Sequence, residues 1–138
     1  MAAALQFDEQ NTRKLKALYR VSGIGQRYSV LEDYTRQNGD FSFYPNTPTL
    51  EPFPTVQQRM DVYRKHAVDL SEKAIRNCLE LAGTTQLTEL THLITVSCTG
   101  MYAPGLDIDL VERLELSPCV KRTSVNFMGC YAAFNAIK

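Results

Sequence analysis

One cysteine in this chain has the sequence context of an activated nucleophile. Cys130 follows an apolar, β-leaning stretch, Val120 to Phe127, and the dipeptide Met128-Gly129. A run of small and apolar residues with good helix propensity comes after it. The pattern predicts a buried strand, a tight turn, and a helix whose first turn contains Cys130. Free N–H groups and the dipole at a helix start favour a thiolate, which is the nucleophilic form of cysteine.

A structural role for Cys130 is the competing interpretation. Free cysteine is among the most buried residue types and usually acts as a small apolar filler. Gly129 directly before it favours the chemical role, because glycine permits a positive φ and a close backbone approach. A non-catalytic interaction or dimerisation module, with Cys130 in its core, therefore remains an alternative. The two interpretations differ in the reactivity of the thiol.

Composition limits the other functional classes. The 138 residues are enough for one domain, are 44% apolar and 22% charged, and carry 15 basic and 15 acidic side chains. A net charge of zero gives no overall basic field for nucleic acid or an anionic membrane, and no apolar run is long enough to span a bilayer. The four cysteines, Cys78, Cys98, Cys119 and Cys130, lack zinc-site spacing, so we expect free thiols and a cytoplasmic protein.

A βαβ unit should position Cys130. Leu93 to Ser97 is a short apolar strand, of the kind that is buried on both faces of a parallel sheet. A loop from Cys98 to Leu106 and a helix from Asp107 to Leu116 lead to the strand at Val120. Ligands of parallel sheets gather at the carboxyl ends of the strands. We therefore expect the Cys98 loop and the Cys130 turn to line one crevice.

The first half of the chain carries weaker signals. We expect a helix over Asn11–Val21, a short strand and turn within Gln26–Tyr34, and a proline-rich loop over Asn38–Pro54. The clearest helix runs from Val56 to about Ala82, with Gly83 as its stop. Its core-facing stripe is predicted to be Met60, Tyr63, Ala67, Leu70, Ala74, Cys78 and Leu81.

Four basic residues gather on the first helix: Arg13, Lys14, Lys16 and Arg20. A solvated helix face explains such a cluster most simply. The functional alternative is a docking patch for a phosphorylated ligand, such as the tail of coenzyme A.

Several blocks of the sequence resemble the chalcone synthase-like type III polyketide synthases. These blocks are Thr91–Gly100, Ala103–Asp107, Val120–Arg122 and Gly129–Ala132, in the order and spacing of that family. The resemblance extends over nearly the whole chain. It implies an α/β fold: the N-terminal half of a thiolase-like αβαβα fold, with a mixed or parallel sheet and covering helices. It also implies a homodimer that uses no metal and no permanently bound cofactor.

The resemblance implies a reaction and a site. Family members load an acyl group from acyl-CoA onto a cysteine and extend it with malonyl-CoA. Cys130 matches that nucleophile, and Cys98 and Thr99 match residues that line the pocket beside it. Ala103 matches a loop position that reaches across the dimer, and Lys14 matches a basic residue near the CoA phosphates.

The length of the chain departs from the family pattern. The family's catalytic His and Asn lie far beyond the cysteine, whereas His66 and His92 both precede Cys130. We therefore expect residues 1–138 to form an incomplete N-terminal domain portion that is inactive by itself, because it lacks an imidazole partner and oxyanion donors. A ketoacyl-carrier-protein synthase III-like enzyme is a close alternative, since it shares the cysteine chemistry and differs in its extender.

Overall fold

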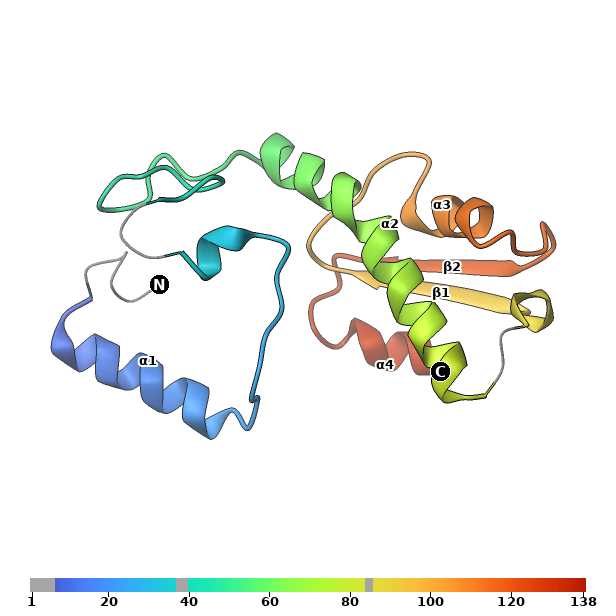
Figure 1. Cartoon of the computed structure of the whole chain (residues 1–138), viewed down its shortest axis with the longest axis horizontal. Coiled ribbons are helices and arrows are strands. Elements are labelled where there is room, and N and C mark those ends of the chain that lie inside the picture. The colour runs from blue at the N-terminus through green and yellow to red at the C-terminus, as the bar shows by residue number, and fades with distance from the viewer. Residues whose placement is uncertain (1–6, 37–39, 84–85) are drawn as a thin grey trace. The chain divides into compact units, whose positions relative to one another are not determined.

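A computed structural model describes residues 7–36, 40–83 and 86–138 and divides the chain into two compact units, residues 1–55 and 56–138 (Figure 1). The first unit contains α1 (Glu9–Val21) and a short 3-10 helix, η1 (Glu32–Tyr34). The second contains α2 (Val56–Leu81), η2 (Leu87–Glu89), β1 (His92–Ser97), α3 (Leu106–Arg113), β2 (Lys121–Asn126) and α4 (Ala132–Ile137). Among the described residues, no helix has the length and apolarity needed to cross a membrane.

Helix α1 begins two residues earlier than its apolar pattern predicts. The Asp8 carboxylate accepts a hydrogen bond of 2.7 Å from the backbone N–H of Asn11 and caps the first turn. The strand expected within Gln26–Tyr34 is wrong: the backbone there is irregular and ends in η1. That segment has no neighbouring strand among the described residues, and a lone extended segment cannot form a ladder.

A buried carboxylate organises the proline-rich loop of the first unit. Asp33 accepts hydrogen bonds from the N–H groups of Ser42, Phe43 and Tyr44 and from the Ser42 hydroxyl, all between 2.8 and 2.9 Å. Burial favours the neutral acid, but these four donors outweigh it and lower the pKa of Asp33 to about 2. The loop is therefore ordered around one acid. Its expected first residues, Asn38 and Gly39, lie outside the described residues.

The long helix α2 is confirmed almost residue for residue, and Gly83 follows it with a φ of 73°. Only the first part of the predicted stripe packs inward. Ala67 is buried, whereas Leu70 and Leu81 are 54% and 90% exposed. The buried face instead continues through Val68 and Ile75, which pack on the core of the second unit.

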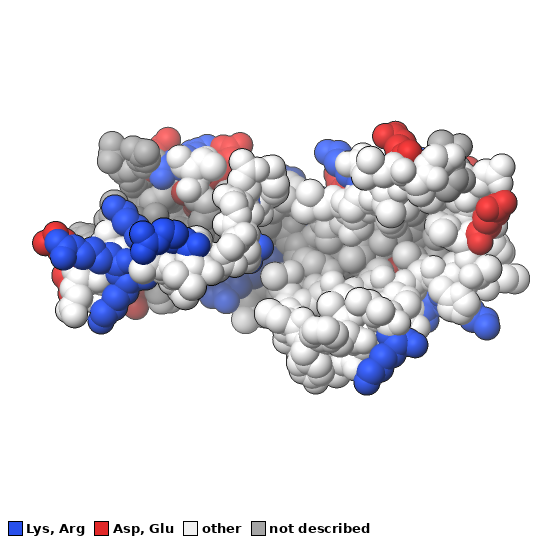
Figure 2. Space-filling view, turned by 90° about the horizontal axis from the view of Figure 1, so that it is seen from below, with Lys and Arg blue, Asp and Glu red and all other residues white. Residues whose placement is uncertain are grey.

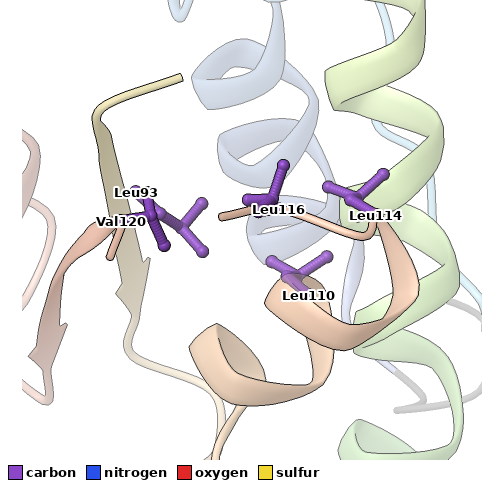
Figure 3. Close-up of a cluster of buried hydrophobic side chains, with 5 residues drawn as sticks. All are labelled: Leu93, Leu110, Leu114, Leu116 and Val120. Atoms are coloured by element: carbon purple, nitrogen blue, oxygen red, sulfur yellow. The ribbon is translucent and has the colours of Figure 1, made fainter. Parts of the chain in front are cut away.

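The core of the second unit lies between α2, α3 and the start of the sheet (Figure 3). Five side chains form it: Leu93, Leu110, Leu114, Leu116 and Val120. Helix α3 ends at Arg113, three residues before the predicted end. A turn follows, in which Glu115 adopts a φ of 52° and the Leu116 N–H donates to the Val111 carbonyl. This turn still directs Leu114 and Leu116 into the core.

Strands β1 and β2 pair in parallel, as predicted, with His92 opposite Lys121 and Ser97 opposite Asn126. Helices α3 and α4 both contact the two strands, and Figure 1 shows α3 above them and α4 below. The expectation that β1 is buried on both faces is wrong. Its residues alternate, with Leu93 and Thr95 buried and Ile94 and Val96 more than 40% exposed. The expectation of a buried strand before Cys130 is also wrong, because four of the six β2 residues are exposed and the other two are half-buried. Helix α3 covers one face, and the short α4 leaves much of the opposite face open.

Candidate active site

The candidate active site lies at the carboxyl edge of the two strands. The register ends with Ser97 opposite Asn126, and the Phe127 N–H donates to the Ser97 carbonyl at 2.9 Å. Both strands end here, and the backbone leaves the sheet at the same edge after each of them. The two segments with candidate chemistry, the Cys98 loop and the Cys130 turn, therefore start side by side, as the parallel pairing requires.

The Cys130 turn has the tight geometry that the sequence predicts. Phe127 and Gly129 both adopt positive φ values, 55° and 73°, so the chain reverses within a few residues of β2. The Ala132 N–H then donates to the Gly129 carbonyl at 3.1 Å and closes a turn around Cys130. Cys130 is exposed, so it is not part of the buried core of the second unit.

The predicted position of Cys130 inside a helix is wrong. Helix α4 begins at Ala132, with Tyr131 as its N-cap residue, and is six residues long. Cys130 lies just outside it, because the turn hydrogen bond to Gly129 precedes the helical hydrogen bonds.

A hydrogen bond joins the two loops. The Cys98 thiol donates to the Gly129 carbonyl at 3.2 Å, so Cys98 lies against the residue that directly precedes Cys130. This contact confirms that the two segments meet. Thr99 and Ala103, the other predicted pocket residues, are exposed on the same loop, while Lys14 is exposed on α1 in the other unit. Figure 2 shows Lys and Arg side chains gathered over the part of the chain that contains α1.

Contacts that the sequence interpretation missed hold the Cys98 loop. The Ser97 hydroxyl donates to the Gly100 carbonyl at 3.0 Å and accepts from its N–H at 3.4 Å. A Cβ on Gly100 would lie 2.4 Å from the Cγ of Tyr63 on α2, so the loop backbone presses directly against that ring. A glycine that follows a strand end is the sequence signal for such a close approach.

Tyr102 secures the far end of this loop. Its ring stacks edge-on with Tyr63 at a centroid distance of 6.1 Å, and the Arg64 guanidinium lies 5.8 Å from its centre. Its hydroxyl donates to Asp109 at 2.5 Å. Burial and this hydrogen bond to a carboxylate both raise the pKa of Tyr102 above its usual range. Tyr102 therefore stays neutral and joins the loop to α2 and α3.

Among the described residues, neither histidine is hydrogen-bonded to Cys130. His92 begins β1, and its Nδ1 lies 2.9 Å from the Thr91 hydroxyl. Cys98 follows the other end of that six-residue strand, about 16–20 Å away at the usual rise per residue. His66 is half-buried on α2. Within the described residues, no group of three or more His, Cys, Asp or Glu side chains could hold a metal.

Comparison with known proteins identifies the family of this chain. The family model for the N-terminal domain of chalcone and stilbene synthases matches residues 5–138. The chain therefore belongs to the chalcone and stilbene synthase family. That model spans both compact units as one N-terminal domain.

Individual relatives agree with this assignment. The chain is 32% identical to the alpha-pyrone synthesis polyketide synthase-like protein of Mycobacterium tuberculosis, over 98% of this chain and 32% of that protein. It is 31% identical to the 3,5-dihydroxyphenylacetyl-CoA synthase of Amycolatopsis balhimycina, over 90% of this chain and 30% of that protein. The chain thus spans about a third of the length of the curated relatives it matches.

A solved structure supports the fold. The polyketide synthase PKS-I of the brown alga Ectocarpus siliculosus superposes with a TM-score of 0.69 at 34% identity, over 97% of this chain and 36% of that one. The predicted α/β, thiolase-like fold is therefore confirmed. The roles of Cys130, Cys98, Thr99, Ala103 and Lys14 remain predictions.

Proposed function

We propose that this chain carries the acyl-loading nucleophile of a type III polyketide synthase-like condensing enzyme. The observation that carries the proposal is the position of Cys130. Its exposed thiol follows β2 in a tight turn at the carboxyl edge of the sheet, in a chain of the chalcone and stilbene synthase family. Family membership supports the class of enzyme, and the geometry supports the choice of residue.

The proposed chemistry has two stages. The Cys130 thiolate attacks the thioester carbonyl of an acyl-CoA and expels the CoA thiolate, so that the acyl group is held as an enzyme thioester. Malonyl-CoA then loses carbon dioxide, and the resulting enolate attacks that thioester. A C–C bond forms, the S–C bond breaks, and the Cys130 thiolate is released. No metal or permanently bound cofactor takes part in this scheme.

The neighbouring residues take supporting roles in this proposal. Cys98 and Thr99 line the pocket that receives the acyl chain, since Cys98 contacts the residue before Cys130. Ala103 lies further along the same loop, at the position that reaches across a homodimer. Lys14, exposed on α1, binds the CoA phosphates as a point charge.

Further groups are needed for a full catalytic cycle. A general base must generate the thiolate, and hydrogen-bond donors must stabilise the oxyanion of the tetrahedral intermediate. Neither His66 nor His92 has a hydrogen bond to Cys130 within the described residues. We therefore propose that the chain by itself makes no polyketide, and that a longer, cytoplasmic, dimeric protein supplies the missing His and Asn.

A condensation assay on the longer protein tests this function. We expect carbon dioxide release and an extended product from an acyl-CoA and malonyl-CoA, and loss of both in the Cys130→Ala variant. Cys119→Ala is the matched control, because that cysteine is also exposed but lies beyond α3. Extension only from a malonyl carrier protein would instead assign the synthase III-like alternative. No extension from either donor would contradict the proposal.

A further inference from the structure

Two cysteines lie near each other at the candidate site. The Cys98 sulfur lies 3.2 Å from the carbonyl oxygen of Gly129. That carbonyl group belongs to the peptide bond between Gly129 and Cys130. Standard peptide dimensions place that oxygen about 2.8 Å from the next Cα, so the Cys98 sulfur lies within about 6 Å of the Cys130 Cα. A cysteine sulfur lies about 2.8 Å from its own Cα, so the two Cα atoms lie within about 9 Å of each other. Disulfides join residues whose Cα atoms are about 4.4–6.8 Å apart, so a small movement can bring the two cysteines into bonding range.

The surroundings allow the remaining movement. Both thiols are exposed, and among the described residues the Cys130 thiol has no hydrogen-bond partner that would hold it elsewhere. Gly129 has a φ of 73°, and no atom lies within 4 Å of the position that a Cβ would take. The backbone before Cys130 can therefore shift without a steric clash. The hydrogen bond that must break is a weak one from a thiol.

The other two cysteines are not placed in this way. Cys119 precedes β2, at the opposite edge of the sheet from Cys98. The paired strands are six residues long, which separates the two edges by about 16–20 Å. Cys78 lies near the end of α2 and is exposed. Cys119 therefore does not share the proximity that Cys98 has to Cys130.

We propose that Cys98 and Cys130 form a reversible disulfide when the protein meets a hydroperoxide. The Cys130 thiolate attacks one oxygen of the peroxide and becomes a sulfenic acid, while the O–O bond breaks and the other oxygen takes up a proton and leaves as an alcohol, or as water when the oxidant is hydrogen peroxide. The Cys98 thiolate then attacks the sulfenic sulfur, an S–S bond forms, and the S–OH oxygen leaves as water. The pair of thiols gives up two electrons and two protons per peroxide, and a dithiol reverses the reaction by exchange.

The consequence for activity rests on the proposed function. A sulfur held in a disulfide cannot accept an acyl group, so oxidation would stop loading. It would also protect Cys130, because a sulfenic acid without a neighbouring thiol is oxidised further to an irreversible sulfinic acid. Cys98 thus acts as a resolving thiol as well as a pocket residue.

Peptide mapping after mild oxidation tests the disulfide directly. The reduced protein is treated with hydrogen peroxide, the free thiols are alkylated, and the digest is analysed by mass spectrometry. We expect one dominant cross-link, between the peptides of Cys98 and Cys130, that disappears with a dithiol. In Cys98→Ser the cross-link should be lost and Cys130 should gain two oxygens, whereas Cys119→Ser should behave like the wild type. In denaturant, the preference for this pair should disappear.

Two results would overturn the inference. One is sulfinic acid at Cys130 in the wild type at the same rate as in Cys98→Ser. The other is a folded protein whose cross-links involve Cys78 or Cys119 as often as Cys98. Acyl loading is measured separately, before oxidation. A protein that forms the disulfide but never loads an acyl group would contradict the proposed function and leave the disulfide standing.

Discussion

Gly100 shows how a single residue sets the position of the Cys98 loop. Its backbone touches the Tyr63 ring so closely that a methyl group would lie 2.4 Å from the Cγ atom. The ring cannot retreat freely, because it also packs edge-on against Tyr102. The fit of one glycine therefore links α2 to the segment that carries Cys98.

We predict that Gly100→Ala destabilises the protein by about 1–3 kcal/mol, as overpacking of a tight contact does. Gly25→Ala is the matched control: its Cβ would meet no atom within 4 Å, and we expect a change within about 0.5 kcal/mol. Urea unfolding measures both. In a Tyr63→Ala background the cost of Gly100→Ala should fall, because the contacts with Cγ and Cδ1 of the ring are lost while the contact with Cβ at 2.8 Å remains, and an unchanged cost there would contradict the ring contact.

Asp33 fixes the position of a loop in the first unit, as Gly100 does in the second. It does so through the hydrogen bonds of a charged carboxylate and not through close packing. Its carboxylate receives four hydrogen bonds from Ser42, Phe43 and Tyr44 and is almost fully buried. An amide in its place would direct an NH₂ group at some of these donors. The loop around it therefore depends on the ionised form.

We predict that Asp33→Asn lowers stability by about 1–3 kcal/mol, the cost of unsatisfied buried donors. The pH dependence follows from the sign of the shift. The pKa of Asp33 falls from 3.8 to about 2 on folding, so its contribution is complete above about pH 4 and is lost as the pH falls towards 2. Urea midpoints measured from pH 6 to pH 2 should show this loss in the wild type and not in Asp33→Asn. Asp40→Asn, an exposed carboxylate, should keep the wild-type profile.

At the scale of elements, α3 holds the second unit together mainly through apolar contact. Leu110 is 1% exposed and lies in the centre of the five-residue core. On the outer side of the same helix, Arg113 pairs with Asp69 at 3.3 Å and Glu72 at 2.8 Å of α2, with 56% of its side chain exposed. Exposed ion pairs contribute little, because water and salt screen them.

Leu110 and Arg113 allow the stability contributions of burial and of ion pairing to be compared within one helix. We predict that Leu110→Ala costs about 2–5 kcal/mol, since it leaves a cavity, and that Arg113→Ala costs about 1 kcal/mol or less. Thermal unfolding of the second unit measures both. Equal losses would mean that charge pairing, and not burial, joins α3 to α2.

The elements that local pattern determines are the ones that the sequence predicts well. Helix α2 has strong periodicity and β1 has a continuous apolar run, and both elements are confirmed. Patterns fail where a tertiary partner decides the outcome. The inward stripe of α2 moves from Leu70 to Ile75 because α3 packs on that side. Cys130 stays outside α4 because a turn hydrogen bond to Gly129 forms first.

The candidate site was also predictable only where a local pattern determines it. Two strand ends at one sheet edge indicate that the Cys98 loop and Cys130 meet, and the hydrogen bond between Cys98 and Gly129 confirms it. The contacts that fix the loop could not be derived, since Tyr63 is 37 residues before Gly100 and no local pattern relates them.

At the scale of the whole chain, the region after β2 leaves large apolar side chains open to solvent. Phe127, Tyr131, Phe134 and Ile137 are each more than half exposed. Large exposed apolar patches are uncommon on monomeric proteins and are typical of interaction surfaces.

We therefore predict that the 138-residue chain binds a hydrophobic dye such as ANS in its folded state. The variant Phe134→Ser/Ile137→Ser should bind less dye, whereas Leu81→Ser, at the C-terminal end of α2, should have a smaller effect because it removes only one exposed apolar side chain. Dye fluorescence near the buffer level, with tyrosine near-UV dichroism intact, would contradict the exposed patch.

The central claim is that Cys130 is the residue that accepts an acyl group. The most direct measurement is to incubate the longer protein with a panel of acyl-CoAs and to map adducts on its cysteine peptides by mass spectrometry. We predict a thioester on Cys130 that is absent from Cys130→Ala and retained in Cys119→Ala. Acylation spread equally over Cys78, Cys98, Cys119 and Cys130, or no adduct on any of them, would contradict the account and favour an interaction module without catalytic function.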